Sequence, residues 1–269
     1  PSVAVAGDNI HVIWTHWLLQ AAPDIYYSRM PLGGDEWLTA TVIADTGPVS
    51  QYARMAVDKN GNLHVVWQEN ISPTNGILYV SGTVGISQTT WSSPITVSTG
   101  LSVDATSPDI FVGADYMVNT VFGVDVAGQP DTQDVYYARF PVSDTENISP
   151  TSIPGSRVLV HRQLPTFASP SLALSGPDEV HVVWNGVKGT DLWERIYYAM
   201  SDDSGASWSQ PMAISPDDDW ADGFATIATD GTLVHVAWQQ KGLGDDNDIY
   251  YSHSLPIFTL FPFVVKDYS

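Results

Sequence analysis

The stretch His-Val-Val-Trp at residues 64–67 decides the fold, because it recurs along the chain. A histidine, two aliphatic residues and a tryptophan stand in this order at residues 11–14, 64–67, 181–184 and 235–238. A degenerate copy, Asn-Thr-Val-Phe, occupies residues 119–122. Short runs of β-branched and aromatic residues are typical of strands. The sequence therefore predicts five equivalent strands and an internal repeat.

A second motif follows each copy and keeps the same order. It reads DIYYS, ILYVS, DVYYA, RIYYA and DIYYS at residues 24–28, 77–81, 134–138, 195–199 and 248–252. Aligned on its fourth position, the motif recurs every 53 to 61 residues, at Tyr27, Val80, Tyr137, Tyr198 and Tyr251. Two motifs that keep the same order over five units indicate a repeat protein.

Each unit is expected to form four antiparallel strands. An alternating segment precedes the His-Val-Val-Trp strand, at residues 3–5, 54–57, 109–112, 171–174 and 224–227, and a last strand follows the Tyr-Tyr strand. A four-stranded sheet with two apolar faces cannot bury both alone, so such units stack around an axis. We therefore predict an all-β, five-bladed β-propeller of four-stranded antiparallel blades. A single domain over residues 1–269 would hold blades at about 1–48, 49–103, 104–166, 167–217 and 218–269.

Composition and charge limit the function classes. The chain has 269 residues, 43% of them hydrophobic, with 10 Trp, 12 Tyr and no Cys. Its 30 Asp and Glu against 10 Lys and Arg give a net charge of −20, which repels a phosphate backbone, so no nucleic-acid partner is expected. The sequence holds no run of about 20 apolar residues, so no membrane span is expected. The acidic balance and a chain that starts at Pro1 favour a secreted or cell-surface protein.

Residues 201–208 carry a resemblance to a known family. The stretch reads SDDSGASW and resembles the Asp box, S-x-D-x-G-x-T-W, of the BNR/Asp-box repeats in sialidase-like β-propellers, with Ser207 in place of threonine. The resemblance implies a sialidase-like propeller over essentially the whole chain. It also implies that Ser201, Asp203, Gly205 and Trp208 form a structural turn between the third and fourth strands of a blade, away from an active face.

The same resemblance implies what a sialidase needs: three arginines that bind a carboxylate, a tyrosine nucleophile with a glutamate, and an aspartate acid/base. Of the six arginines in the chain, only Arg54 begins an innermost strand. One arginine cannot form the triad, so we assign no catalytic residue and expect no sialidase activity. A glycoside hydrolase that uses a carboxylate pair stays open as an alternative, because acid/base hydrolysis needs two carboxylates roughly 5 to 10 Å apart.

The loops before the first strand and after the second strand of each blade are expected at one end of a propeller. Aromatic, amide and charged side chains gather in these segments: Trp17, Tyr52, Arg54, Glu69, Asp109, Trp193, Asp219, Trp220, Asp222 and Gln239. Sugar rings stack on exposed Trp and Tyr faces, while amides and carboxylates bind sugar hydroxyls. The main functional hypothesis is therefore a non-catalytic glycan-binding module. The alternative interpretation is that these aromatic side chains only pack between loops.

Metal binding is not the favoured interpretation of the repeated histidines. His11, His64, His181 and His235 occupy equivalent places on different blades and point in rotated directions, so they cannot converge on one ion. We expect them to be structural, and we expect no cofactor. The acidic runs at residues 217–219 and 245–248 offer oxygen ligands for calcium as a less favoured alternative, but neither has the spacing of an EF-hand loop.

Residues 257–265 form the most hydrophobic run, IFTLFPFVV. The run falls where the last strand of the fifth blade is expected. Pro262 cannot donate a hydrogen bond to a neighbouring strand, so this strand should lie at a sheet edge. An apolar edge offers another alternative function, namely a structural surface protein that assembles with itself or with other chains.

Overall fold

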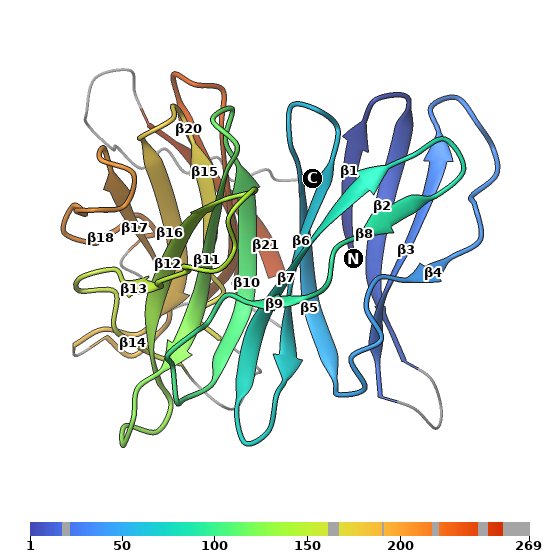
Figure 1. Cartoon of the computed structure of the whole chain (residues 1–269). Helices are drawn as coiled ribbons and strands as arrows, with labels where there is room; N and C mark the ends of the chain where they lie inside the picture. Colours follow the sequence, from blue (N-terminus) through green and yellow to red (C-terminus); the bar gives the residue numbers. More distant parts are fainter. Residues whose placement is uncertain (18–21, 161–166, 190, 217–220, 242–246, 255–269) are drawn as a thin grey trace. The chain divides into compact units, whose positions relative to one another are not determined.

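The computed structural model describes residues 1–17, 22–160, 167–189, 191–216, 221–241 and 247–254, and these residues form strands and connecting turns with no α-helix (Figure 1). The strands form five separate antiparallel sheets, numbered here 1 to 5 along the chain. Within the described ranges no helical segment has the length and apolarity that crossing a bilayer requires. The predicted all-β fold of successive antiparallel sheets is confirmed.

Sheets 1 and 2 each follow a simple up-and-down order. Sheet 1 consists of β1 (Ser2–Ala6), β2 (Asn9–His16), β3 (Asp24–Pro31) and β4 (Thr41–Val42). Sheet 2 consists of β5 (Ser50–Val57), β6 (Leu63–Asn70), β7 (Asn75–Val84) and β8 (Thr89–Trp91), and β9 (Ile95–Thr96) also pairs with β7. The second strand of each sheet carries the His-Val-Val-Trp motif, and the third carries the Tyr-Tyr motif.

Sheets 3 to 5 repeat this plan. Sheet 3 consists of β10 (Ala105–Val112), β11 (Met117–Asp125), β12 (Thr132–Pro141) and β13 (Thr151–Ser152), with β14 (Val158–Leu159) also on β12. Sheet 4 consists of β15 (Ser171–Leu174), β16 (Val180–Gly186), β17 (Arg195–Ser201) and β18 (Met212–Ala213). Sheet 5 shows β19 (Asp222–Thr229), β20 (Val234–Lys241) and β21 (Asn247–His253). The fourth strand predicted at residues 257–265 lies outside the described residues.

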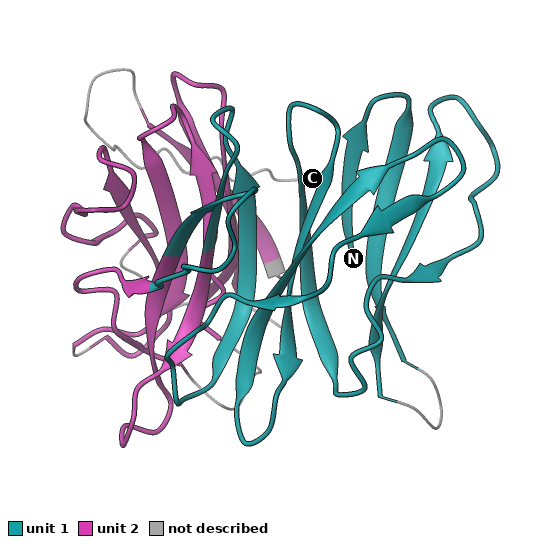
Figure 2. Cartoon of the chain, viewed as in Figure 1, with its two compact units in different colours: residues 1–120, 138–150 teal, residues 121–137, 151–269 magenta. Residues whose placement is uncertain are grey.

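The chain divides into two compact units (Figure 2). Unit 1 comprises residues 1–120 and 138–150, and unit 2 comprises residues 121–137 and 151–269. The boundary runs through β11 and β12 of sheet 3. The single domain over residues 1–269 stays a prediction.

The core of unit 1 forms where the first strand of one sheet packs on its predecessor. β5 contacts β1, β2 and β3, and β10 contacts β5, β6 and β7. Alternate residues of each strand point into these contacts, as the period of two predicts. The buried cluster of unit 1 includes Ile13, Ile25, Tyr27, Met55, Leu63, Val65, Trp67 and Val80. Burial of these large apolar side chains is the main stabilising contribution to the unit.

Unit 2 is packed by the same rule. β19 contacts β15, β16 and β17, so the first strand of sheet 5 covers a face of sheet 4. The tryptophans that end the repeated motif, Trp184 and Trp238, have exposed fractions of 0% and 1%. Each stacks on the tyrosine beside it in the neighbouring strand, Tyr197 or Tyr250. The motif tryptophans of this unit are therefore core residues.

Each repeated histidine is hydrogen-bonded to a tyrosine of the next strand. The Nδ1–hydroxyl distances are 2.8, 2.7, 2.8 and 2.6 Å in the pairs His11–Tyr27, His64–Tyr79, His181–Tyr198 and His235–Tyr251. The two rings of each pair are stacked, with centroids about 6 Å apart. These contacts agree with the structural role expected for the histidines.

The register corrects one alignment made from the sequence. Strand pairing places Tyr27 opposite Ile13 in sheet 1 and Tyr79 opposite Val66 in sheet 2, two residues after the histidine in both cases. Tyr79, and not Val80, is therefore the equivalent of Tyr27. The alignment on Val80 was wrong because the second motif is displaced by one residue in sheet 2, as the strand register and the hydrogen bond between His64 and Tyr79 both show.

Two of these tyrosines, Tyr27 and Tyr79, link their sheet to the following one through edge-to-face aromatic contacts. The ring centroids of Tyr27 and Trp91 lie 5.3 Å apart, and those of Tyr79 and Phe140 lie 5.2 Å apart, both within unit 1. A Cβ atom at Gly82 would lie 2.5 Å from the Trp91 ring, so this contact requires glycine. Such contacts stabilise a stack of sheets beyond simple area burial.

Residues 201–208 form the corresponding contact in unit 2. Asp203 closes a turn by accepting hydrogen bonds from the Ser207 amide at 2.7 Å and from the hydroxyls of Ser207 and Ser201 at 2.6 and 2.8 Å. The Trp208 ring packs edge-to-face on Tyr137 of sheet 3 at 5.4 Å. Gly205 has a φ of +90°, and a Cβ there would lie 2.2 Å from the Tyr137 ring. This turn follows β17 and positions Trp208 against the preceding sheet.

Replacing Asp203 with Asn should lower the melting temperature by a few degrees. Hydrogen bonds from Ser207 hold the pKa of Asp203 below its ordinary value, so the turn needs the ionised carboxylate as acceptor. Thermal unfolding followed by circular dichroism measures the effect. Asp202→Asn removes the same charge from the neighbouring exposed residue and is the control. Equal melting temperatures for the two variants would contradict this role of Asp203.

Candidate functional site

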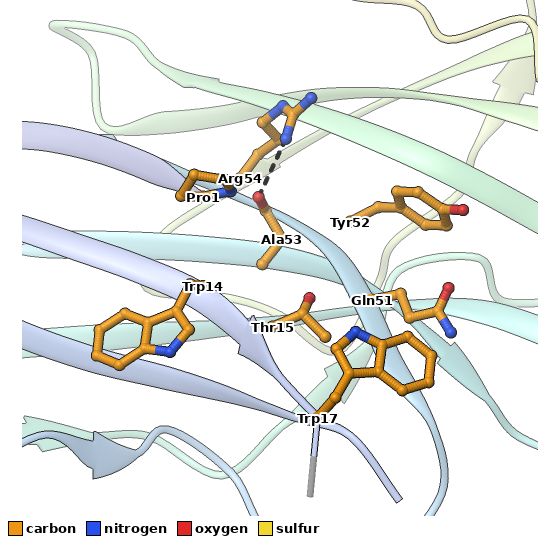
Figure 3. A pocket seen from close by; sticks show the side chains of 8 residues that line it. All are labelled: Pro1, Trp14, Thr15, Trp17, Gln51, Tyr52, Ala53 and Arg54. Carbon is orange, nitrogen blue, oxygen red and sulfur yellow. Dashed lines mark hydrogen bonds between the residues drawn. The ribbon is translucent and has the colours of Figure 1, made fainter.

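A pocket of about 250 Å³ opens in unit 1 where β2 ends and β5 begins. Eight residues line it: Pro1, Trp14, Thr15, Trp17, Gln51, Tyr52, Ala53 and Arg54 (Figure 3). Three of the residues predicted from the sequence, Trp17, Tyr52 and Arg54, therefore lie in one pocket. The rings of Trp17 and Tyr52 extend to the same side of the view, with the Gln51 amide between them.

A β-bulge presents Tyr52 to the pocket. The pairing of β5 with β6 shifts between Gln51 and Arg54, and Tyr52 within this shift has a φ of +54°, a left-handed conformation that non-glycine residues seldom adopt. The bulge leaves the Tyr52 side chain 40% exposed, whereas the adjacent Ala53 is 5% exposed. Bulges and left-handed residues are concentrated at functional sites, where they redirect a side chain.

The same backbone feature recurs where the later sheets begin. Ser107, Ser169 and Phe224 have φ values of +50°, +39° and +52° at positions equivalent to Tyr52. The register of β19 with β20 shifts between Gly223 and Thr226, as it does in sheet 2. Phe224 of unit 2 is 62% exposed and was not among the predicted site residues. An alignment of the first strand of each sheet on Tyr52 would have identified Phe224 as its equivalent.

Trp17 and Trp14 supply the other aromatic surfaces of the pocket. Trp17 follows the end of β2 and is 67% exposed. Trp14 is partly exposed and packs on Tyr26, with ring centroids 6.0 Å apart. Its equivalent in sheet 2, Trp67, is 1% exposed. The pocket thus has one aromatic ring held against the sheet and two that extend into solvent.

Arg54 is the exposed basic side chain of the pocket. Its guanidinium donates to the Ala53 carbonyl at 3.3 Å and has no carboxylate partner in the part of the chain that the structure describes. By contrast, Arg139 pairs with Asp115 at 2.6 Å and Arg157 with Asp134 at 2.8 Å. The donors of Arg54 are therefore available to a bound anion or hydroxyl group.

Two predicted acidic residues are buried hydrogen-bond acceptors. Glu69 is 1% exposed and accepts from Trp67 Nε1 and Ser50 Oγ, both at 2.7 Å, and from Thr46 Oγ1 at 3.0 Å. Asp222 of unit 2 is also 1% exposed and accepts from Trp238 Nε1 at 3.1 Å and Gln240 Nε2 at 3.0 Å. These carboxylates fix the motif tryptophans and do not line the pocket.

The remaining predicted residues are not among the lining of this pocket. Asp109 is partly exposed on β10 of unit 1. In unit 2, Trp193 is 46% exposed between β16 and β17, and Gln239 is partly exposed on β20. Asp219 and Trp220 lie outside the described residues. The predicted residues were grouped only by their positions in the sequence. Of them, the pocket of unit 1 brings together Trp17, which follows β2, with Tyr52 and Arg54 of β5.

No set of three or more His, Cys, Asp or Glu side chains within the described ranges is arranged to hold a metal ion. The acidic run at residues 217–219 and the residues Asp245 and Asp246 lie outside those ranges. The four repeated histidines bind tyrosine hydroxyls through Nδ1. The calcium alternative stays a prediction for the two acidic runs.

Comparison with known proteins defines the fold class. No protein-family model matches the sequence, and no curated protein matches it. A solved α-L-arabinanase of Penicillium chrysogenum in complex with arabinobiose is similar, with a TM-score of 0.60, 11% identity and coverage of 76% of this chain and 62% of that chain. A polysaccharide lyase of family PL25, an ulvan lyase bound to a GlcA–Rha3S unit, has a TM-score of 0.64, 11% identity and coverage of 91% and 62%.

A sialidase of Trypanosoma rangeli is also similar, with a TM-score of 0.58, 11% identity and coverage of 94% of this chain and 45% of that chain. The chain therefore spans less than two thirds of the length of each of these structures. At this identity the likeness concerns the fold alone. The chain has the sialidase-like β-propeller fold, and its five sheets are the blades.

Proposed function

We propose that this chain is a non-catalytic glycan-binding module whose unit 1 pocket holds one sugar ring. The observation that carries the proposal is the pair of exposed aromatic side chains, Trp17 and Tyr52, in one pocket with the Gln51 amide. Aromatic faces pack on the apolar faces of sugars, and amide groups bind hydroxyls. A volume of about 250 Å³ suits one ring, since pockets for larger ligands start at roughly 300 Å³.

The backbone supports a preformed site. Tyr52 is held by a bulge whose left-handed conformation costs free energy, of order 1 to 3 kcal/mol, and persists only because the surrounding sheet imposes it. A ring fixed in this way loses little conformational entropy when a ligand binds. Some of the structures similar in fold are described as complexes with carbohydrates, namely arabinobiose and a GlcA–Rha3S unit. These descriptions concern those proteins, and they favour a glycan as the first ligand class to test here.

The lining of the pocket favours binding over hydrolysis. A glycosidase that follows the usual acid/base route needs two carboxyl groups on either side of the scissile bond. None of the eight lining residues is Asp or Glu. The nearby candidate Glu69 is buried and already accepts three hydrogen bonds. The pocket therefore offers stacking and hydrogen bonding without an acid/base pair.

The proposal also covers the cellular location of the protein and its relationship to a repeat family. We propose a secreted or cell-surface location and a relationship to the BNR/Asp-box repeats. The hydrogen-bonded turn around Asp203 supports the second point, because it uses the serine, aspartate, glycine and tryptophan of the motif. The acidic composition supports the first.

Substitution of the aromatic residues tests the function. A glycan array identifies a ligand, and titration calorimetry then compares the wild type with Trp17→Ala and Tyr52→Ala. We expect each variant to bind about tenfold more weakly, because a lost aromatic contact of about 1.4 kcal/mol corresponds to that ratio. Trp37→Ala removes a tryptophan that is 48% exposed outside the pocket and should leave affinity unchanged. Unchanged affinity in both pocket variants, or no glycan ligand at all, would contradict the proposal.

A further inference from the structure

We infer that Arg54 makes the pocket selective for a sugar that carries a carboxylate on a six-membered ring, that is, a hexuronate residue of a glycan. This inference deepens the proposed function and rests on it. The proposed function needs only the aromatic and amide groups, whereas the selectivity needs the guanidinium. The two statements can therefore fail separately.

The charge balance of the chain makes Arg54 unusual. With 30 acidic and 10 basic residues, the chain offers three carboxylates for each basic side chain. Arg139, Arg157 and Arg195 each pair with an aspartate within 4 Å. Arg54 is exposed and bonds only to the carbonyl of Ala53 within the described residues. An unpaired guanidinium in a pocket of so acidic a chain is available for a carboxylate that comes from the ligand.

The chemistry of the guanidinium specifies the acidic group. Its planar array of donors matches the two oxygens of a carboxylate and binds them in a bidentate manner. Such charge-assisted bonds are roughly twice as strong as neutral ones. A neutral hydroxyl at the same place accepts only part of this donor set. The pocket should therefore distinguish a uronate from the corresponding neutral hexose.

The arrangement of the lining fits a hexuronate. In Figure 3 the rings of Trp17 and Tyr52 extend to the right of Ala53, and the Arg54 side chain extends upward from it. A sugar ring that packs its face on an aromatic ring directs its equatorial carboxylate outward from the ring edge. In this orientation the stacking and the ion pair use different parts of one ligand. The volume of about 250 Å³ matches one six-carbon ring better than a larger acidic sugar.

A matched set of ligands tests the inference. The probes are a glucuronate-containing oligosaccharide, the same oligosaccharide after reduction of its carboxylate to the neutral alcohol, and an O-sulfated form of that neutral oligosaccharide. Titration calorimetry at one fixed salt concentration compares wild type, Arg54→Gln and Arg157→Gln. Arg157→Gln is the control, because it removes the same charge from an ion pair with Asp134 in unit 2.

For the wild type and for Arg157→Gln we expect the uronate to bind about tenfold more tightly than its reduced form. Arg54→Gln should remove this preference and leave affinity for the reduced form within about twofold of the wild type. A preference that survives in Arg54→Gln overturns the inference, and so does equal binding of the sulfated and uronate forms. Equal binding of all three ligands by the wild type overturns the inference and leaves the glycan-binding function standing. Binding of no ligand overturns both.

Discussion

Substituting Glu69 with Ala should cost about 3 kcal/mol of folding free energy, because Glu69 is a buried acceptor for three donors. The side chain is 1% exposed, and its two carboxylate oxygens accept from Trp67, Ser50 and Thr46. Alanine leaves the Trp67 indole NH in the core without an acceptor and opens a cavity beside the ring. Urea unfolding measured by tryptophan fluorescence gives the change in free energy, which corresponds to a large fraction of a typical domain stability.

Glu69→Gln is the matched control. Its amide oxygen can keep the bond from Trp67, and its NH₂ group can face Thr46, whose hydroxyl rotates to accept. We therefore expect a cost of about 1 kcal/mol for Gln. Both variants should bind glycan with wild-type affinity while folded, since Glu69 does not line the pocket. A Glu69→Ala protein with wild-type stability but weaker glycan binding would restore Glu69 as a ligand-binding residue.

Periodicity made the fold predictable. The histidine–tyrosine pairs and the motif tryptophans recur with short local patterns, and each pattern corresponds to a contact between adjacent strands. The turn at residues 201–208 has a recognisable motif of its own and makes a contact between adjacent sheets. The one misalignment, at Val80, occurred where the second motif is displaced by one residue. Strand register is fixed by hydrogen bonds across the sheet, and a pattern within one strand does not contain them.

The site was predictable only in part. Trp17, Tyr52 and Arg54 were expected from their positions at the ends of strands, and the structure places them in one pocket. Glu69 has the same kind of position, yet it is buried, because the indole of Trp67 two residues earlier needs an acceptor. Whether an acidic residue at a strand end faces solvent or a tryptophan depends on the side chains across the sheet. The bulge at Tyr52 also has no local signature, since tyrosine does not favour a positive φ.

Pocket and core are connected through the strands they share. β5 carries the pocket residues Tyr52 and Arg54, and it also carries Met55 and Val57, which lie in or against the unit 1 core. β2 likewise carries the buried Ile13 and the pocket residue Trp14, and Trp17 directly follows its end. A binding surface on paired, buried strands is more rigid than one on a free loop. This explains how a small pocket can hold a fixed geometry.

Acidification below about pH 6.5 should destabilise the protein, because three core histidines are held neutral. Burial lowers the pKa of His11, with a further contribution from the charge of Arg29. Burial also lowers the pKa of His64 and of His181, while Asp58 and Glu179 oppose the shift. These histidines bind a proton near pH 6.5 in the unfolded chain but only at lower pH in the folded chain. The free energy of unfolding therefore falls as the pH drops from the unfolded pKa to the folded pKa. The slope within that window approaches about 1.4 kcal/mol per pH unit for each histidine.

Urea unfolding at intervals from pH 8 to pH 5 measures this slope, and His181→Asn tests its origin. Blade 3 carries Asn119 where the other blades carry histidine, so the fold already accepts a residue that does not titrate at this place. The variant loses the bonds to Tyr198 and Ser175 and should be less stable at pH 8. Its stability should nevertheless fall less steeply between pH 6.5 and 5, because one proton-binding site of the unfolded chain is gone. A slope identical to that of the wild type would show that His181 titrates equally in the folded and unfolded chains and that its burial does not exclude the proton.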